Sequence, residues 1–343
     1  MTQPTHVRRP TLEDVARQSG VSRSTVSRVI NGQTPVRAEV VDRVRRVVTE
    51  LGYIPNQAAR QLVTHRTGTI AVVAAQPENR LFLDPFFDLL LRGVRRELAQ
   101  HGAQAVLLFV DEPDDYPRVA DYLGGGHVDG AILFSLRPGD RLHEMTARLG
   151  LPAVFGGRPL LHEGDTVRSH AYVDGDNRGG ARLAVRHLTA LGRERIATVA
   201  GPHDQETSAA DRLAGYHDVL PHAPATLVER ADYTRQGGAD AMAALLDRHP
   251  DLDAVFVASD LMAAGALTTL RERGRRVPAD VAVVGFDDLT AIAEATDPPL
   301  TTVHQDVPGM GALLARLLIR SEAGSPRPRS AIVPTRLVRR ASA

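Results

Sequence analysis

The segment Val21–Asn31, VSRSTVSRVIN, carries four Ser or Thr hydroxyls and two Arg beside a small apolar set. On a helix, at about 100° per residue, one face holds the polar residues Arg23, Ser24, Ser27, Arg28 and Asn31. The opposite face holds the apolar residues Val26, Val29 and Ile30. The segment therefore predicts a short helix that packs through small branched side chains and presents hydroxyls and guanidinium groups outward.

The flanking residues predict two further helices. Thr11-Leu-Glu-Asp14 is typical of a capping box that opens a helix, and Ser19-Gly20 predicts the turn before Ser22, an N-cap. A Val-rich run from about Ala38 to Leu51 predicts a third helix that Gly52 ends. This pattern indicates a helix-turn-helix, in which short hydroxyls let the second helix lie close in a major groove and Arg can reach guanine edges. A three-helix bundle with an ordinary polar surface is the alternative.

The charge is unevenly distributed along the 343 residues, a length that predicts two or three domains. Residues 1–66 hold eleven Arg against five acids, a net +6, and the remainder holds 30 Arg against 36 acids, a net −6. A basic head on an acidic body indicates that the head meets a polyanion, with a solvated basic surface as the alternative.

Several function classes lack the residues that they need. The chain has no Cys, and all 41 basic residues are Arg, which excludes thiolate sites, phosphate-loop lysines and Schiff-base lysines. Gly124-Gly-Gly126 has no Gly-Lys after it and is interpreted as a helix stop, and the thirteen His form no HExxH pair. We therefore expect no enzyme activity, no metal and no cofactor. No apolar run is long enough to span a membrane and no signal peptide is seen, so we expect a cytoplasmic, nucleoid-associated protein.

The stretches TLEDVARQSGVSRSTVSRVIN, residues 11–31, and ELGYIPNQAARQL, residues 50–62, resemble the DNA-binding head of the lac repressor (LacI/GalR) family of bacterial transcription regulators. The resemblance is nearly gapless over residues 11–62 and continues more weakly to the C-terminus. It implies that Arg23 and Ser24 select the operator and that Tyr53 and Asn56 contact phosphates. The full set of DNA contacts that it implies is Thr11, Arg23, Ser24, Ser27, Arg28, Asn31, Tyr53, Asn56, Ala59 and Leu62.

The segment Pro55–Leu62 is compatible with a hinge helix. Asn56 follows a proline as an N-cap, but about seven residues are too few to stay helical alone in water, so the segment should fold only against a partner. By resemblance, Leu62 opens the centre of the operator, and an apolar side chain suits a wedge between base steps in the minor groove. A plain interdomain linker is the alternative.

From Thr69 onward, apolar strand-like runs alternate with amphipathic helices, which predicts parallel sheets with covered faces. The expected fold is an all-α helix-turn-helix head followed by a two-lobed α/β core like the periplasmic binding proteins. The expected domains are 1–55 for the head, 56–68 for the hinge helix and linker, and 69–343 for the core. Lobe 1 should hold about 69–172 and 304–331, and lobe 2 about 173–303 and 332–343. Chain crossings are expected at Thr301–Gln305 and near Ile332–Thr335.

A ligand should bind between the lobes, at the carboxyl ends of the strands. The resemblance implies that Arg212 clamps hydroxyls or carboxylates and that Asp287 holds sugar hydroxyls. The complete set of effector contacts expected is Phe87, Arg212, Tyr233, Asp260 and Asp287. Taken one at a time, these residues fit surface, capping or core roles equally well or better. Phe155-Gly-Gly-Arg158 lacks the acid that galactoside-binding members have here, which weakens any assignment to a particular sugar.

The function expected is that of a sequence-specific repressor controlled by a small molecule, and a sugar is the class of molecule expected. A co-repressor-dependent regulator or an activator of the same family is the alternative, and a sugar-binding protein without a DNA role is the alternative from another class. One recognition helix reads a half-site, so a pseudo-palindromic operator requires a dimer. The chain ends soon after its last strand, without the leucine-heptad tail that makes the lac repressor a tetramer, so we expect a homodimer and no membrane partner.

Overall fold

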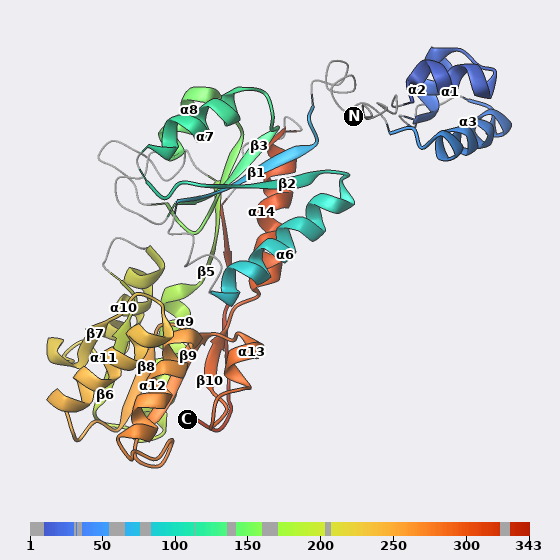
Figure 1. Ribbon diagram of the computed structural model, residues 1–343. Coiled ribbons are helices and arrows are strands. Elements are labelled where there is room, and N and C mark those ends of the chain that lie inside the picture. The colour runs from blue at the N-terminus through green and yellow to red at the C-terminus, as the bar shows by residue number, and fades with distance from the viewer. Residues whose placement is uncertain are drawn as a thin grey trace, which may run out of the picture. The chain divides into compact units, whose positions relative to one another are not determined.

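The computed structural model divides the chain into two units, residues 1–67 and residues 68–343. Figure 1 shows the elements of both. The structure describes residues 10–30, 32, 36–54, 66–75, 84–112, 114–135, 142–159, 171–202, 207–322 and 330–343. Within these residues, no helix is both long enough and apolar enough to cross a membrane.

The first unit contains the helices α1 (Leu12–Ser19), α2 (Arg23–Ile30) and α3 (Ala38–Leu51). The predicted capping box is present, because the Asp14 amide donates to the Thr11 hydroxyl while the Thr11 amide donates to the Asp14 carboxylate. Gly20 and Gly52 end α1 and α3 in the left-handed conformation. The predicted helix-turn-helix with a third supporting helix is therefore confirmed.

A small apolar core holds these three helices together. Its buried members are Val15, Ala16, Val26, Val29, Val44, Val47 and Tyr53. The apolar stripe predicted for α2 is thus the face that packs inward, with Ile30 partly buried at its end. Short branched side chains suit this role because they let three short helices approach closely.

Lobe 1 of the second unit is a parallel sheet between two helical layers. The strand order is β11-β5-β4-β3-β1-β2. The strands are β1 (Thr69–Ala75), β2 (Gln104–Phe109), β3 (Gly130–Ser135), β4 (Ala153–Gly156), β5 (Ala171–Gly175) and β11 (Ala331–Val333). The helices are α6 (Pro85–Gln100), α7 (Asp115–Gly124), α8 (Leu142–Leu149) and α14 (Val307–Glu322). Ile70 and Val72 pack toward α6 and α14, while Ala71 and Val73 pack toward α7 and α8, which explains the unbroken apolar run of β1.

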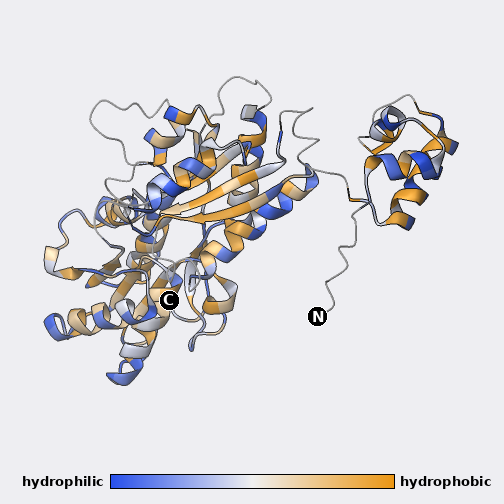
Figure 2. Ribbon diagram, turned by 45° about the horizontal axis from the view of Figure 1, so that its top comes forward, coloured by the Kyte–Doolittle hydropathy of each residue, from blue (hydrophilic) through white to orange (hydrophobic). Residues whose placement is uncertain are grey.

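Lobe 2 repeats this layered plan. The strand order is β12-β10-β9-β8-β6-β7, with β12 antiparallel to β10. The strands are β6 (Ile196–Ala200), β7 (Val228–Arg230), β8 (Ala254–Val257), β9 (Ala282–Asp287), β10 (Thr301–His304) and β12 (Arg336–Val338). The helices are α9 (Asn177–Ala190), α10 (Thr207–Val219), α11 (Arg235–Arg248), α12 (Asp260–Glu272) and α13 (Thr290–Ala293), with a 3₁₀ turn at Ala225–Leu227. In Figure 2 the strands of both sheets are largely hydrophobic and the helices carry one hydrophobic and one hydrophilic side.

The chain passes between the two sheets three times. It leaves lobe 1 after β5, returns between β10 and α14, and leaves again between β11 and β12. All of β5 lies in the first sheet, so the first passage follows Gly175 and not residue 172, where the sequence pattern placed the boundary. The edge strand β7 has only three residues, too few to carry an alternating or apolar pattern that would predict it from the sequence.

Candidate functional site

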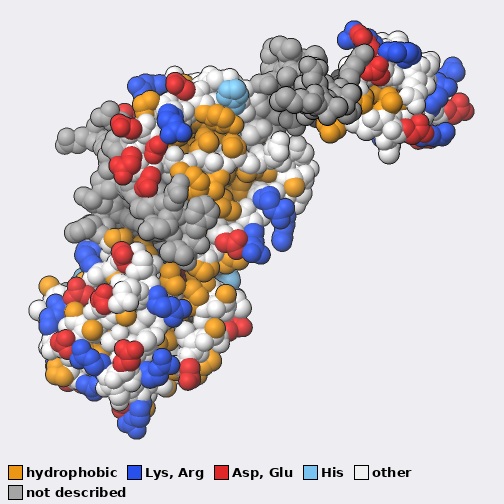
Figure 3. All heavy atoms as spheres, in the orientation of Figure 1, with side chains coloured by type: hydrophobic (Ala, Val, Ile, Leu, Met, Phe, Trp, Pro, Cys, Tyr) orange, Lys and Arg blue, Asp and Glu red, His pale blue; other side chains and the backbone are white. Residues whose placement is uncertain are grey.

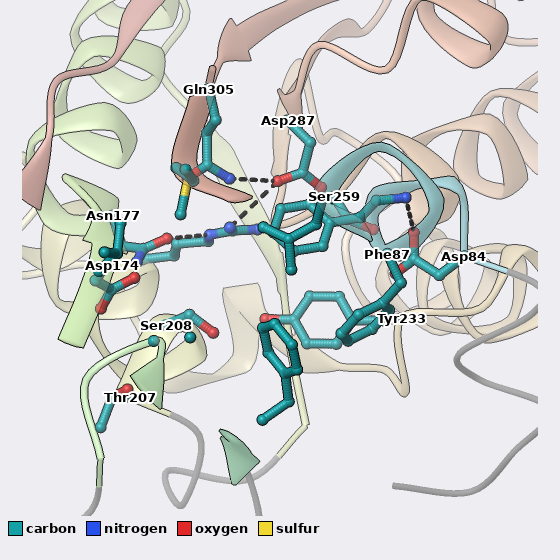
Figure 4. Close-up of a pocket in the computed structure, with 18 of the residues that line it drawn as sticks. Asp84, Phe87, Asp174, Asn177, Thr207, Ser208, Tyr233, Ser259, Asp287 and Gln305 are labelled. Carbon is teal, nitrogen blue, oxygen red and sulfur yellow. Dashed lines mark hydrogen bonds and ion pairs between the residues drawn. The ribbon is translucent and has the colours of Figure 1, made fainter. Parts of the chain in front are cut away.

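A cavity lies in the core, between the carboxyl ends of the strands of the two lobes (Figure 4). Lobe 1 contributes Asp84, Phe86, Phe87, Leu90, Phe134, Gly156, Gly157, Val173, Asp174, Met310 and Leu314. Lobe 2 and the connecting segments contribute Asn177, Thr207, Ser208, Arg212, Tyr233, Ser259, Asp287 and Gln305. One wall is therefore mainly apolar and aromatic, and the other is mainly polar.

Arg212 organises the polar wall. It projects from α10 and is 6% exposed. Its Nε donates to Asn177 Oδ1 at 2.9 Å, one Nη donates to Asp287 Oδ1 at 3.2 Å, and the other donates to the Ala258 carbonyl. The guanidinium carbon lies 3.8 Å from the centre of the Phe286 ring. These contacts fix the orientation of the guanidinium at the cavity, where it can donate hydrogen bonds to ligand oxygens.

Asp287 is the acid that faces this guanidinium. Gln305 Nε2 donates to Asp287 Oδ1 at 2.7 Å, so one carboxylate oxygen is shared by an amide and Arg212 (Figure 4). The Asp287 pKa is raised to about 7, mainly by burial; Arg212 opposes this shift, and the Asp84 carboxylate from lobe 1 contributes to it. The close approach of Gln305 depends on Gly175, since a Cβ there would lie 2.0 Å from Gln305 Oε1.

A second carboxylate, that of Asp174, lies at the end of β5. Its Oδ1 accepts the Gly175 amide at 2.8 Å and Asn177 Nδ2 at 2.9 Å. Burial raises the Asp174 pKa from its ordinary value, which the hydrogen bond from the Arg158 amide opposes. Asn177 thus links Asp174 to Arg212, and a chain of hydrogen bonds runs from lobe 1 into lobe 2.

The apolar wall is built on stacked rings. Phe87 meets Phe86 edge to face with centroids 5.7 Å apart, and meets Phe134 edge to face at 6.0 Å. The Phe134 ring lies directly over Gly156, where a Cβ would be 2.0 Å from a ring carbon. Gly156, the last residue of β4, is therefore a packing requirement of this wall, and the ring faces give an apolar surface of the kind that the flat side of a sugar can cover.

Residues with a strained backbone conformation also lie at the cavity. Among the described residues other than glycine, φ is positive at Tyr233, Asp287 and Asp288, with values of 60°, 106° and 56°. Tyr233 and Asp287 both line the cavity. Such backbone costs about 1–3 kcal/mol per residue and persists where the surroundings fix it, as they do at binding sites.

Four of the five effector residues expected from the sequence line the cavity together: Phe87, Arg212, Tyr233 and Asp287. Asp260 does not, and this expectation is corrected. It is 0% exposed, and its carboxylate accepts the Leu289 amide at 2.7 Å and the Thr302 hydroxyl at 2.5 Å. Burial raises the Asp260 pKa well above its ordinary value. The preceding residue, Ser259, is the one that reaches the cavity.

Other lining residues were not identified from the sequence. They include Asp174, Asn177, Phe134, Ser208 and Gln305. Their position in the sequence was the available signal, since Asp174 lies at the end of a strand and Gln305 is the last residue of the expected crossing and directly follows β10. Both are polar side chains at the carboxyl end of a buried strand, where ligands bind in folds of this kind.

The head presents the expected polar face of α2. Arg23, Ser24 and Arg28 are exposed and Ser27 is partly buried. Arg23 pairs with Glu13 at 2.9 Å and Arg28 Nε donates to the Ser24 carbonyl at 3.4 Å. Figure 3 shows Arg side chains along the surface of the head.

Two further residues of the expected DNA-binding set have structural contacts in the head. The Thr11 hydroxyl donates to Asp14 Oδ2 at 2.7 Å, and Tyr53 is 9% exposed and belongs to the apolar core. The remaining members of that set, Asn31, Asn56, Ala59 and Leu62, lie outside the described residues.

Comparison with known proteins gives two family matches. Residues 11–56 match the bacterial regulatory proteins of the lacI family, and residues 185–343 match the periplasmic binding protein-like domain. The chain is 48% identical to the HTH-type transcriptional regulator CelR of Thermobifida fusca over 316 residues, which cover 91% of this chain and 92% of that protein.

Two solved structures are similar over nearly the whole chain. The first is a complex of the transcriptional regulator CelR with cellobiose, with a TM-score of 0.77 and 44% identity, covering 98% of this chain and 100% of the other. The second is a lac repressor dimer bound to operator and the anti-inducer ONPF, with a TM-score of 0.83 and 29% identity, covering 98% and 99%.

Proposed function

The chain belongs to the lacI family of bacterial regulatory proteins, and from this premise we propose that it is a transcriptional repressor controlled by a sugar. In this proposal the head binds operator DNA in the cytoplasm and the sugar binds between the two lobes of the core. The protein acts as a homodimer, one head on each half of a pseudo-palindromic operator. It has no catalytic activity of its own.

The observation that supports sugar binding is the Arg212–Asp287 pair at the edge of the cavity. Sugar hydroxyls both donate and accept hydrogen bonds, so they can satisfy a carboxylate and a guanidinium at once. Phe87 and Phe134 offer the apolar counterpart on the other wall. A cavity with a few fixed polar groups and an aromatic wall suits a pyranose better than a wholly charged or wholly apolar ligand.

We propose a β-linked glucose disaccharide as the ligand class, with cellobiose as the first member to test. This choice rests on the likeness to CelR, whose solved complex contains cellobiose. Asp84 and Asp174 lie on lobe 1 and Ser208, Ser259 and Asp287 on lobe 2, so hydroxyls of one bound molecule could be held by both lobes. Binding would then favour one arrangement of the lobes over another.

The DNA half rests on the exposed face of α2. Arg23 and Ser24 at its start and Arg28 one turn later are free of any buried contact and can reach base edges. The segment 56–68 serves as hinge and linker in this proposal, with Leu62 as the wedge, on the strength of the sequence resemblance. A change in lobe geometry would separate the two hinges of the dimer and unfold them. A coupling of about 1–3 kcal/mol is enough for control.

A gel-shift titration with DNA from upstream of the gene, with and without cellobiose, tests the proposal. A shift that cellobiose releases supports an induced repressor. Binding that requires cellobiose would make the protein co-repressor-dependent. Cellobiose binding without any DNA binding would favour a sugar-binding protein, the alternative that the exposed basic face of α2 argues against. Turnover of cellobiose, followed by thin-layer chromatography, would contradict the absence of catalysis.

A further inference from the structure

Arg158 joins the two lobes at the edge of the cavity. It follows β4 in lobe 1, and its guanidinium lies 2.7 Å from the Asp211 carboxylate on α10 of lobe 2. The Thr207 hydroxyl, on the same helix, donates to the Arg158 carbonyl at 2.7 Å. The Arg158 amide donates to Asp174 Oδ2 at 3.2 Å, which ties the residue to its own lobe. We call Arg158, Thr207 and Asp211 the interlobe clasp.

The clasp borders the cavity on α10, since Thr207 is also one of the residues that line it. Thr207 and Asp211 are four residues apart and lie one above the other on the helix. Ser208 and Arg212 form the neighbouring row and line the cavity. A bond from lobe 1 to the first row therefore fixes the position of the second row, and with it the guanidinium that faces Asp287.

The lobes also meet through apolar side chains. Phe86 and Leu89 of α6 pack against Leu289 and Ile292 of lobe 2. Figure 1 places α10 and α13, which contains Ile292, on opposite sides of lobe 2. The apolar contact contains no charged group, whereas the clasp joins the lobes on the α10 side through an ion pair and a hydroxyl. The effects of the two contacts on lobe closure can therefore be distinguished by mutation and by salt concentration.

We propose that Arg158 is a positioning residue that holds the lobes closed on the α10 side and thereby slows the release of the effector. The proposal rests on the proposed function for its ligand, but both bonds of the clasp join protein atoms and need no ligand. The side chains of Arg158 and Asp211 are 40% and 29% exposed, so the pair is partly solvated and its contribution is modest. Because this contact between the lobes is weak, it can break and re-form, which lets the cavity open to release the effector.

A matched control exists on the same helix. Arg178 of α9 lies 2.6 Å from Asp218 of α10, with side-chain exposures of 54% and 25%. Chemistry and exposure resemble those of the clasp, but both residues belong to lobe 2. Arg178→Ala therefore reports the cost of losing an Arg–Asp pair on α10 without touching the contact between lobes.

The first experiment measures lobe closure without ligand. The chain has no Cys, so single cysteines at Leu149 of lobe 1 and Leu191 of lobe 2, which are 40% and 48% exposed, can carry a pair of spin labels. Double electron–electron resonance should give a longer or broader distance distribution for Arg158→Ala and Asp211→Asn than for the parent. Arg178→Ala should leave the distribution unchanged. Identical distributions for Arg158→Ala and the parent would overturn the clasp.

The second experiment measures release of cellobiose by stopped flow. Arg158→Ala should raise the dissociation rate about two- to fivefold, the range for a partly exposed ion pair, with little change in the association rate. The difference from the parent should shrink in 1 M NaCl, where exposed charges are screened. An unchanged dissociation rate in a variant that binds cellobiose counts against the proposal. A parent protein that binds no cellobiose counts against the proposed ligand, and the spin-label result then decides the clasp alone.

Discussion

The head and the core place their functional polar groups in opposite ways. On α2 of the head, Arg23, Ser24 and Arg28 are exposed, and the ion pair between Arg23 and Glu13 joins side chains that are 66% and 60% exposed. In the core, Arg212 and Asp287 are 6% and 5% exposed, and both are already hydrogen-bonded to protein groups. Water solvates the polar groups of the head until a binding partner displaces it. A ligand of the core must instead form hydrogen bonds with groups that are already hydrogen-bonded to each other.

This difference predicts unequal sensitivity to mutation. Removing an exposed side chain loses only its contacts with the partner, because no protein group is left unsatisfied. Removing a buried one also strands its protein partners in a place that water reaches poorly. Substitutions in the core should therefore have larger effects than substitutions on α2, and each should affect one binding activity.

The largest effect is expected for Arg212→Ala. Truncating one partner of a buried, hydrogen-bonded charge pair costs about 2–5 kcal/mol, and here it leaves Asn177 and Asp287 without their common donor. Cellobiose affinity measured by calorimetry should fall by that amount, while operator affinity without sugar should stay at the parent value.

Arg178→Ala is the control for Arg212→Ala, because it removes an exposed guanidinium from the same lobe. If Arg212→Ala releases operator at the parent's cellobiose concentration, Arg212 does not hold the ligand. If it binds neither operator nor sugar, its role is structural and the contrast between head and core is lost.

The next largest effect is a pH dependence of the free energy of unfolding, which arises from Asp287. Its pKa is about 7 in the folded protein, against about 3.8 as the ordinary value, because burial disfavours the charged form. Between these values the folded state binds a proton that the unfolded chain has lost. This contribution to stability is present at low pH and is lost as the pH rises to 7, at up to about 1.4 kcal/mol per pH unit.

Urea unfolding of the parent and of Asp287→Asn, from pH 5 to pH 8, measures this contribution. The free energy of unfolding of the parent relative to the variant should fall between pH 5 and pH 7 and level off as the pH approaches 8. A difference that stays constant over this range would show that the Arg212 guanidinium keeps the carboxylate ionised throughout.

The sequence could predict the head better than the cavity, and the reason is physical. The stripe of Val26 and Val29 and the Thr11–Asp14 box are local patterns, so one short segment contains all the information needed. The cavity combines Phe134, Asp174 and Gln305 from distant segments, and which strand-end side chain points inward depends on how the strands align.

Ser259 and Asp260 show the limit of reading strand ends. Both follow β8, and the family resemblance favoured the acid as the ligand contact. The carboxylate of Asp260 instead turns into the protein toward Leu289 and Thr302, 29 and 42 residues further along. No local pattern records these partners. Resemblance supplied Arg212 and Asp287, which strand spacing alone left as surface or capping residues.

A smaller effect is expected for Arg28→Ala. If Arg28 reads a base edge, its loss should cost about 1–3 kcal/mol of operator affinity and relax the preference for operator over random DNA. Cellobiose affinity should not change, since Arg28 lies in the first of the two units. Fluorescence anisotropy on both DNAs distinguishes the roles: an equal loss on operator and random DNA identifies a phosphate contact instead.

The smallest effect is expected for Thr11→Ala, which tests whether the head owes its fold to local capping. The variant removes the hydroxyl that caps α1 and bonds to Asp14, at a cost of about 1 kcal/mol. Amide hydrogen exchange by mass spectrometry on the full chain should then be about fivefold faster in α1 and unchanged in the sheets of the core. Thr11→Ser keeps a capping hydroxyl and should restore the protection of α1. Protection of α1 that is the same in Thr11→Ala as in the parent would show that the packing of Val15 and Val26, more than the cap, holds the helix.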